Sequence, residues 1–189
     1  YRRGIFPWPL EEDLLAWFAP PRRAVLFLER FHVPRSLSKR LRRGEFRFSI
    51  DADFPTVITA CASLTNRGHQ RGTWITSAMI DSYCRLHRRG FCHSVECYYR
   101  DVLAGGLYGV SIGRMFAGES MFYRKPNASK CALVKLIEIL RTQGVTWIDC
   151  QIMTPLLRNF GAVEIPRHRF MNLLKSALDE PAINWSSSL

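Results

Sequence analysis

Three segments with strand character follow one another in the middle of this 189-residue chain, and single residues separate them. Each is rich in aromatic, β-branched and small residues, which favour strands. Parallel strands need a crossover of about a dozen residues or more, so neighbours joined this closely must pair antiparallel. The segments are HSVECYYR (93–100), VLAGGLYGVSIG (102–113) and MFAGESMFYR (115–124). This antiparallel unit is the feature that most limits the possible folds.

A helix, a further strand and a final helix follow these strands. SKCALVKLIEILRTQ (129–143) has apolar residues at helical spacing, and Asn127 or Ser129 can cap it. WIDCQIM (147–153) predicts a strand and RFMNLLKSAL (169–178) a helix. The order predicts an α+β fold with a mixed, mainly antiparallel sheet, and it matches the N-acetyltransferase-like (GNAT-like) core. A fold-level match does not name a function.

The first half of the chain predicts one strand and two helices. AVLFLERFHV (24–33) has strand character, and apolar residues recur at helical steps in 54–64 and again in 76–89. Residues 1–24 are rich in proline and tryptophan and predict an irregular piece. The chain starts with tyrosine instead of methionine, so we expect that upstream residues are missing.

The formal net charge of +11 favours a polyanionic partner, either nucleic acid or an anionic membrane surface. No stretch reaches the ~18 uninterrupted apolar residues of a membrane helix, and no membrane partner is expected. Basic residues cluster in PRSLSKRLRRGEFR (34–47) and at the end of the predicted helix 76–89. Such clusters favour a phosphate backbone. The alternative, that they are merely solvated faces, stays open.

The six cysteines form no CxxC pair, and most lie in apolar periodic segments. His87, Cys92, His93 and Cys97 are close in sequence, but their spacing fits no common zinc pattern. We therefore expect no metal. Reduced, buried thiols are typical of a cytoplasmic protein.

Two polar side chains stand out in the apolar segment WIDCQIM, namely Asp149 and Gln151 on one face of the predicted strand. Glu119, between Gly118 and Ser120, can join them if the two strands are near each other. A buried carboxylate is costly unless it is paired or solvated. The three groups predict either a polar pocket that accepts a proton from an amine or a satisfied structural network.

The loop YRKPNASK (123–130) lies where acetyltransferases carry a glycine-rich loop for the pyrophosphate of acetyl-CoA. It contains no glycine and one proline, so it cannot cradle a pyrophosphate in that way. Together with the basic clusters, this favours an acyl donor whose phosphates lie elsewhere, such as an aminoacyl-tRNA.

Eight motifs in order resemble the leucyl/phenylalanyl-tRNA–protein transferase family. They are GIFPW (4–8), GTWIT (72–76), YCRLH (83–87), HSVE (93–96), GGLYGV (105–110), GESMF (118–122), NASK (127–130) and IDCQ (148–151). The resemblance covers residues 1 to about 174.

The resemblance implies an aminoacyltransferase that moves Leu or Phe, with Met as a further candidate, from aminoacyl-tRNA to the N-terminal Arg or Lys of a protein. The new peptide bond marks that protein for N-end rule degradation. No metal or CoA is implied as cofactor. We expect residues 1–24 to be the remnant of a small N-terminal domain and residues 25–189 to be an acyltransferase-like catalytic domain, in a cytoplasmic monomer.

The resemblance implies a catalytic role for Glu119, Asp149 and Gln151. Around the aminoacyl group and the 3′-adenosine we expect the substrate-binding residues Trp8, Trp74, Tyr83, Phe116, Leu133, Leu136 and Ile148. For the tRNA backbone we expect the basic residues Arg35, Lys39, Arg40, Arg42, Arg43, Arg88 and Arg89.

This chain departs from the family pattern at several positions. AWFAPPRR (16–23) replaces a Trp-Trp-Ser-Pro-Asp-Pro-Arg stretch, Leu156 occupies the position of a His, and NFGA (159–162) replaces Ser-Leu-Gly-Ala. Leu136 stands where relatives often have a larger aromatic residue. Two alternatives therefore stay open. One is a catalytically weak tRNA- or peptide-binding module, and the other is an aminoacyl-tRNA-dependent transferase with another amine acceptor.

Overall fold

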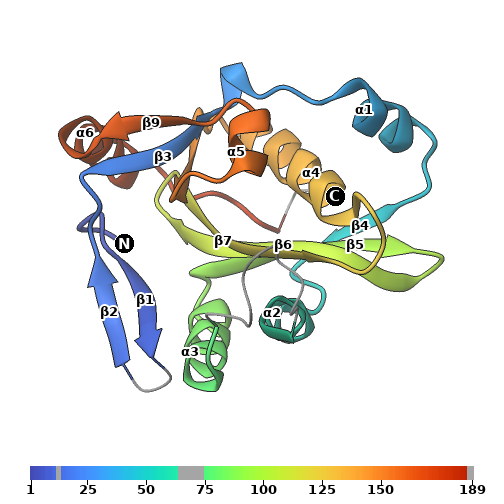
Figure 1. Ribbon diagram of the computed structural model, residues 1–189, viewed down its shortest axis with the longest axis horizontal. Coiled ribbons are helices and arrows are strands. Elements are labelled where there is room, and N and C mark those ends of the chain that lie inside the picture. The colour runs from blue at the N-terminus through green and yellow to red at the C-terminus, as the bar shows by residue number, and fades with distance from the viewer. Residues whose placement is uncertain (12–13, 64–74, 187–189) are drawn as a thin grey trace. The chain divides into compact units, whose positions relative to one another are not determined.

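The computed structural model describes residues 1–11, 14–63 and 75–186 (Figure 1). The strands are β1 (Phe6–Glu11), β2 (Leu14–Phe18), β3 (Arg22–Phe27), β4 (Arg47–Ile50), β5 (Cys92–Tyr99), β6 (Val102–Ile112), β7 (Met115–Tyr123), β8 (Trp147–Gln151) and β9 (Val163–Pro166). The helices are the 3-10 turn η1 (Leu28–Arg30), α1 (Arg35–Arg42), α2 (Phe54–Ser63), α3 (Ser77–Arg88), α4 (Ala128–Thr142), α5 (Pro155–Asn159) and α6 (Arg167–Asp179).

The strands form a two-stranded sheet, β1-β2, and a seven-stranded sheet with the order β4-β5-β6-β7-β8-β3-β9. β5 pairs antiparallel with β4 and β6, and β3 pairs antiparallel with β8 and β9. β7 and β8 are parallel, with Ala117 opposite Asp149, and the helix α4 lies between them in the chain. The predicted α+β fold with a mixed, mainly antiparallel sheet is confirmed.

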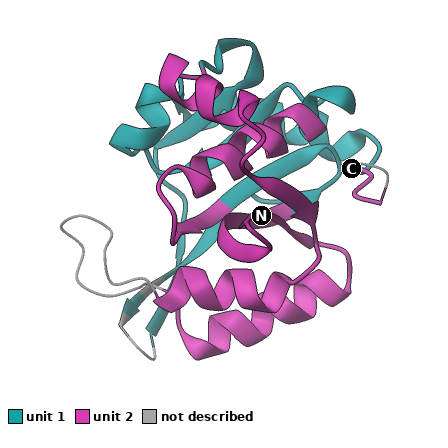
Figure 2. Ribbon diagram, turned by 90° about the vertical axis from the view of Figure 1, so that its right-hand side faces the viewer, with its two compact units in different colours: residues 1–32, 111–118, 140–183 teal, residues 33–110, 119–139, 184–189 magenta. Residues whose placement is uncertain are grey.

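The chain divides into two compact units, which Figure 2 shows in teal and magenta. The first unit comprises residues 1–32, 111–118 and 140–183. Val25 and Leu26 of β3 and Ile148 of β8 are buried in it, together with Phe170 of α6. Its central strand pairing sets Val25 opposite Asp149 and Ala24 opposite Gln151, with an irregularity between the two pairs.

The second unit comprises residues 33–110, 119–139 and 184–189. The helices α2 and α3 cover one side of β5 and β6, and α4 lies on the other side (Figure 1). Phe54 and Ile58 of α2 are fully buried, as are Val95 of β5 and Tyr108 of β6. Gly105 of β6 is required here, because a Cβ at this position would lie 2.7 Å from the Cβ of Ala128.

Several local predictions were wrong. Residues 6–11 and 14–18 are not irregular, since they form the antiparallel strand pair β1 and β2. Prolines in β1 are tolerated because a two-stranded hairpin consists of edge strands only. The predicted strand 24–33 ends at Phe27, immediately before η1, and the predicted strand 147–153 ends at Gln151. The predicted domain boundary after residue 24 stays a prediction.

Candidate active site

Asp149 is held by a buried arginine of the neighbouring strand β3. Nε of Arg23 donates to Oδ1 of Asp149 at 2.8 Å, and Nη2 donates to Oδ2 at 2.7 Å. The two side chains are 1% and 2% exposed. This two-pronged, charge-assisted geometry is the strongest form of an arginine–carboxylate contact. β8 lies between β7 and β3, so it is not an edge strand whose polar face meets water.

Gln151 ends β8 in an unusual backbone conformation. Its φ is +61°, a left-handed backbone angle that residues other than glycine, asparagine and aspartate seldom adopt. Its backbone N–H donates to Oδ1 of Asp149 at 2.9 Å, and Gln151 is 5% exposed. The carboxylate of Asp149 therefore holds both a guanidinium and the turn that positions Gln151. Strained residues held by their surroundings are frequent at functional sites.

Glu119 belongs to the second unit, where it is hydrogen-bonded to Tyr83. The sequence had predicted Tyr83 as a substrate-binding residue. The hydroxyl of Tyr83 donates to Oε2 of Glu119 at 2.9 Å. Tyr83 is 3% exposed and its ring packs edge-on against Tyr108, with 5.5 Å between the ring centres. Tyr83 therefore fixes the carboxylate that was predicted to be catalytic. Asp149 and Gln151 belong to the first unit.

The four residues predicted to line the aminoacyl pocket are buried in their own units. Phe116 and Ile148 lie in the first unit at 0% and 2% exposure, and Leu133 and Leu136 lie on α4 at 8% and 1%. Burial of this kind fits core packing as well as a pocket wall, so their pocket role stays a prediction.

Two tryptophans, Trp8 and Trp74, were predicted to bind the substrate. Trp8 is half-buried on β1, where its ring centre lies 6.3 Å from that of Phe6 and 6.4 Å from that of Phe18. Trp74 lies outside the described residues. Their contacts with a nucleotide stay predictions.

The predicted tRNA contacts lie on two helices of the second unit. Arg35, Lys39, Arg42 and Arg43 are exposed on or next to α1, while Arg40 is half-buried. Arg40 and Arg43 share the carboxylate of Glu45 at 3.8 and 3.7 Å. Arg88 and Arg89 are exposed at the end of α3. The exposed positions are accessible to phosphates, but their role in binding stays a prediction.

The cysteines are reduced and several are strongly buried. Burial raises the pKa of Cys97 to about 12 and that of Cys131 to about 11. Burial, followed by the charge of Asp149, also raises the pKa of Cys150. These thiols are therefore protonated and poor nucleophiles. Over the described residues, no group of three or more His, Cys, Asp and Glu side chains could hold a metal ion.

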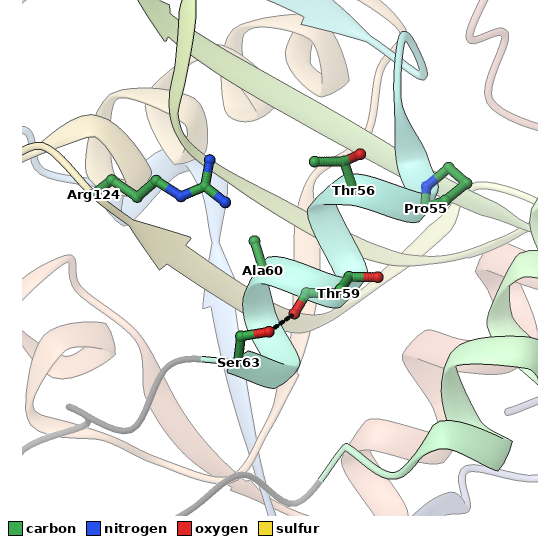
Figure 3. A pocket seen from close by; sticks show the side chains of 6 residues that line it. All are labelled: Pro55, Thr56, Thr59, Ala60, Ser63 and Arg124. Atoms are coloured by element: carbon green, nitrogen blue, oxygen red, sulfur yellow. Dashed lines mark hydrogen bonds between the residues drawn. The ribbon is translucent and has the colours of Figure 1, made fainter.

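A shallow hollow of about 240 Å³ lies on the second unit between α2 and Arg124 (Figure 3). It is lined by Pro55, Thr56, Thr59, Ala60, Ser63 and Arg124. None of the predicted catalytic or substrate-binding residues is among them, and its hydroxyls and single arginine do not form an amine-handling site. No helix within the described part of the chain is long and apolar enough to cross a membrane.

Solved structures with similar folds support the class of protein. The C-terminal domain of a putative lysylphosphatidylglycerol synthetase from Agrobacterium fabrum matches with a TM-score of 0.54 over 98% of this chain and 69% of that domain, at 11% identity. L-PGS from Bacillus licheniformis matches with a TM-score of 0.50 over 84% of this chain and 64% of that one, at 12% identity. At this identity the likeness shows the fold alone. The class that the fold defines is therefore an α+β protein with a mixed, mainly antiparallel sheet.

Sequence relatives identify the family. The model of the leucyl/phenylalanyl-tRNA protein transferase family matches residues 25–175. A leucyl/phenylalanyl-tRNA–protein transferase of Anaeromyxobacter sp. is 51% identical over 183 residues, which cover 97% of this chain and 78% of the relative. One from Pseudomonas entomophila is 48% identical over 182 residues, covering 96% and 80%. The chain belongs to the leucyl/phenylalanyl-tRNA–protein transferase family.

Proposed function

We propose that this chain transfers leucine or phenylalanine from aminoacyl-tRNA to an acceptor protein. The observation that carries the proposal is the family match over residues 25–175, together with 51% identity to a relative named for this reaction. The two held carboxylates, Asp149 with Gln151 and Glu119 with Tyr83, support it because they fall on the motifs IDCQ and GESMF.

The reaction is the aminolysis of an ester. The neutral α-amine of the acceptor attacks the carbonyl carbon of the aminoacyl group, a C–N bond forms, and the C–O bond to the terminal ribose of the tRNA breaks. The amine loses one proton and the departing ribose oxygen gains one, so no external acid or oxidant is needed. Placing the amine and the ester side by side supplies much of the acceleration.

In this proposal Asp149 orients the reacting groups. Its Oδ1 accepts two hydrogen bonds, from Arg23 and from the backbone of Gln151, and its Oδ2 accepts one from Arg23. The carboxylate is engaged by both Arg23 and Gln151, which suits it to orienting the groups around it. The incoming amine is therefore positioned beside Gln151, and a hydroxyl of the tRNA carries the proton to the leaving oxygen.

Glu119 recognises the acceptor in this proposal. Its carboxylate, fixed by the hydroxyl of Tyr83 at 2.9 Å, is suited to the cationic side chain of an N-terminal Arg or Lys. The product then carries an N-terminal Leu or Phe, which directs it to N-end rule degradation in the cytoplasm. The exposed cations of α1 and the end of α3 contact the tRNA backbone, and the enzyme acts as a monomer.

The test is a transfer assay with labelled Phe-tRNA and three peptides that differ only in starting with Arg, Lys or Ala. We expect labelled product with the first two peptides and little with the third. Equal transfer to all three would overturn the role of the acidic acceptor site. Retained Phe-tRNA binding without any product would overturn the transferase and support a binding module, which the apolar Leu156 in place of a His would then explain.

A further inference from the structure

Arg23 carries a buried positive charge and is not among the three residues predicted to be catalytic. It lies on β3, is 1% exposed, and belongs to the same unit as Asp149 and Gln151. A charge is seldom buried unless a partner compensates for the lost water. Its partner is Asp149, which lies 126 positions further along the chain.

The guanidinium of Arg23 is fixed from three directions. The ring of Phe6 lies 4.5 Å from its central carbon and the ring of Phe170 lies 4.6 Å from it. Both distances are within the range of a cation–π contact. In the plane of the guanidinium, Asp149 accepts from Nε and Nη2, and the carbonyl of Gly4 lies 3.4 Å from Nη1. The direction of the carboxylate is therefore set by Arg23 and its two aromatic neighbours.

That direction also determines the backbone of Gln151. The Oδ1 atom that accepts from Nε of Arg23 is the same atom that accepts from the N–H of Gln151 at 2.9 Å. If the carboxylate rotated, this N–H would lose its acceptor. The backbone of Gln151 would then be free to leave its left-handed φ of +61°. The chain of contacts thus runs from Arg23 through Asp149 to Gln151.

We infer that Arg23 is a positioning residue for the aminoacyl transfer, acting through Asp149 on the placement of Gln151. The inference rests on the proposed transferase function. It predicts that the geometry of the fork matters as well as the positive charge, because only a planar guanidinium donates two parallel hydrogen bonds to one carboxylate.

The decisive variant is Arg23→Lys, which keeps the positive charge and removes the paired hydrogen bonds from Nε and Nη2 to Asp149. We expect kcat for transfer from Phe-tRNA to an Arg-starting peptide to fall by about tenfold to hundredfold, the loss that a small misplacement of reacting groups causes. The KM for Phe-tRNA should stay within about threefold. The contacts of Arg23 within the described residues are with Asp149, Gly4 and the two aromatic rings, and none of these was predicted to bind tRNA.

Arg167→Lys is the matched control. The side chain of Arg167 donates to the carbonyls of Gly4 and Arg3 at 2.9 and 3.1 Å, so it holds the same N-terminal segment without being paired to Asp149. Its kcat should stay within about threefold of the wild type. The folded fraction of each variant, measured by urea unfolding, corrects the rates.

A double-mutant cycle separates positioning from a merely structural role. In an Asp149→Asn background, Arg23→Lys should lower kcat by less than about twofold further, because the contact that it acts through is already lost. Fully multiplied losses, or a loss explained by the unfolded fraction, would overturn the positioning role. If Arg23→Lys does not fold, Phe170→Leu takes its place. This variant removes one of the two aromatic rings that contact Arg23 and leaves the ion pair with Asp149. An unchanged kcat in Phe170→Leu would then overturn the inference.

The wild-type reaction separates a failure of the transferase function from a failure of the Arg23 role. A wild type that makes no peptide product overturns the transferase function and with it the role of Arg23. An active wild type with additive effects of Arg23→Lys and Asp149→Asn overturns the role of Arg23 alone.

Discussion

Replacing Tyr83 with phenylalanine removes a single oxygen atom and tests the role of Glu119. The hydroxyl donates to Oε2 of Glu119 at 2.9 Å, and the ring is held separately by its edge-on contact with Tyr108. Because Tyr83 is 3% exposed, its ring should keep its place in the variant. The change therefore removes the charge-assisted hydrogen bond to Glu119 and little packing.

The size of the effect follows from that bond. A hydrogen bond to a charged group contributes about 1.5–3 kcal/mol, and about 1.4 kcal/mol corresponds to a factor of ten. Glu119 is half-exposed, so water replaces part of what is lost and the lower end applies. We expect kcat/KM for an Arg-starting peptide to fall by roughly tenfold, mainly through a higher peptide KM.

The assay is steady-state transfer from labelled Phe-tRNA at varied peptide concentration, and then at varied tRNA concentration with saturating peptide. Tyr123→Phe is the control, since it removes a hydroxyl from a side chain that is 53% exposed. The KM for Phe-tRNA should be unchanged in both variants. Identical peptide kinetics in Tyr83→Phe and wild type would refute the reasoning that Glu119, fixed by Tyr83, recognises the acceptor.

Three further predictions concern stability. Gly105→Ala would bring a Cβ within 2.7 Å of the Ala128 Cβ, and we expect a loss of about 1–3 kcal/mol in urea unfolding, which a wild-type midpoint would contradict. Thr76→Ala removes the cap that accepts from the N–H of Met79 at 3.3 Å, so the thermal midpoint should fall as expected for about 1 kcal/mol, and an unchanged midpoint would count against the cap. Burial raises the pKa of Cys131 from 9.0 to about 11, so its stabilising contribution is full below pH 9.0 and is lost as pH rises toward 11. The urea midpoints of wild type and Cys131→Ala should therefore converge over this range, and a constant difference would argue against the shift.

Long elements with a regular pattern could be predicted from sequence. The strands β5, β6 and β7 and the helices α3 and α4 were expected within a few residues, because alternation or helical spacing runs through each of them. The strands β4 and β9 have four residues each and were missed, since so short a run carries no period. The hairpin of β1 and β2 was missed because its prolines argue against a strand unless both strands are edges.

The candidate site was predicted in part for a similar reason. Asp149 and Gln151 stood out as polar residues two apart in an apolar strand, and Glu119 stood out beside small residues. Arg23 was not singled out, because nothing in PPRRAVLF distinguishes it from the exposed Arg22 next to it. Strand alternation gave no signal either, because Ala24, Val25 and Leu26 are all buried and both faces of β3 are therefore covered.

The sequence by itself determined the residue types, their order along the chain and the family, because these depend on identity and on local spacing alone. Only the tertiary structure decided that the carboxylate of Asp149 is paired with Arg23 and that of Glu119 is held by Tyr83. Those pairings join residues 126 and 36 positions apart. They depend on strand register and helix placement, which are set by packing of the whole core and not by the propensity of any segment.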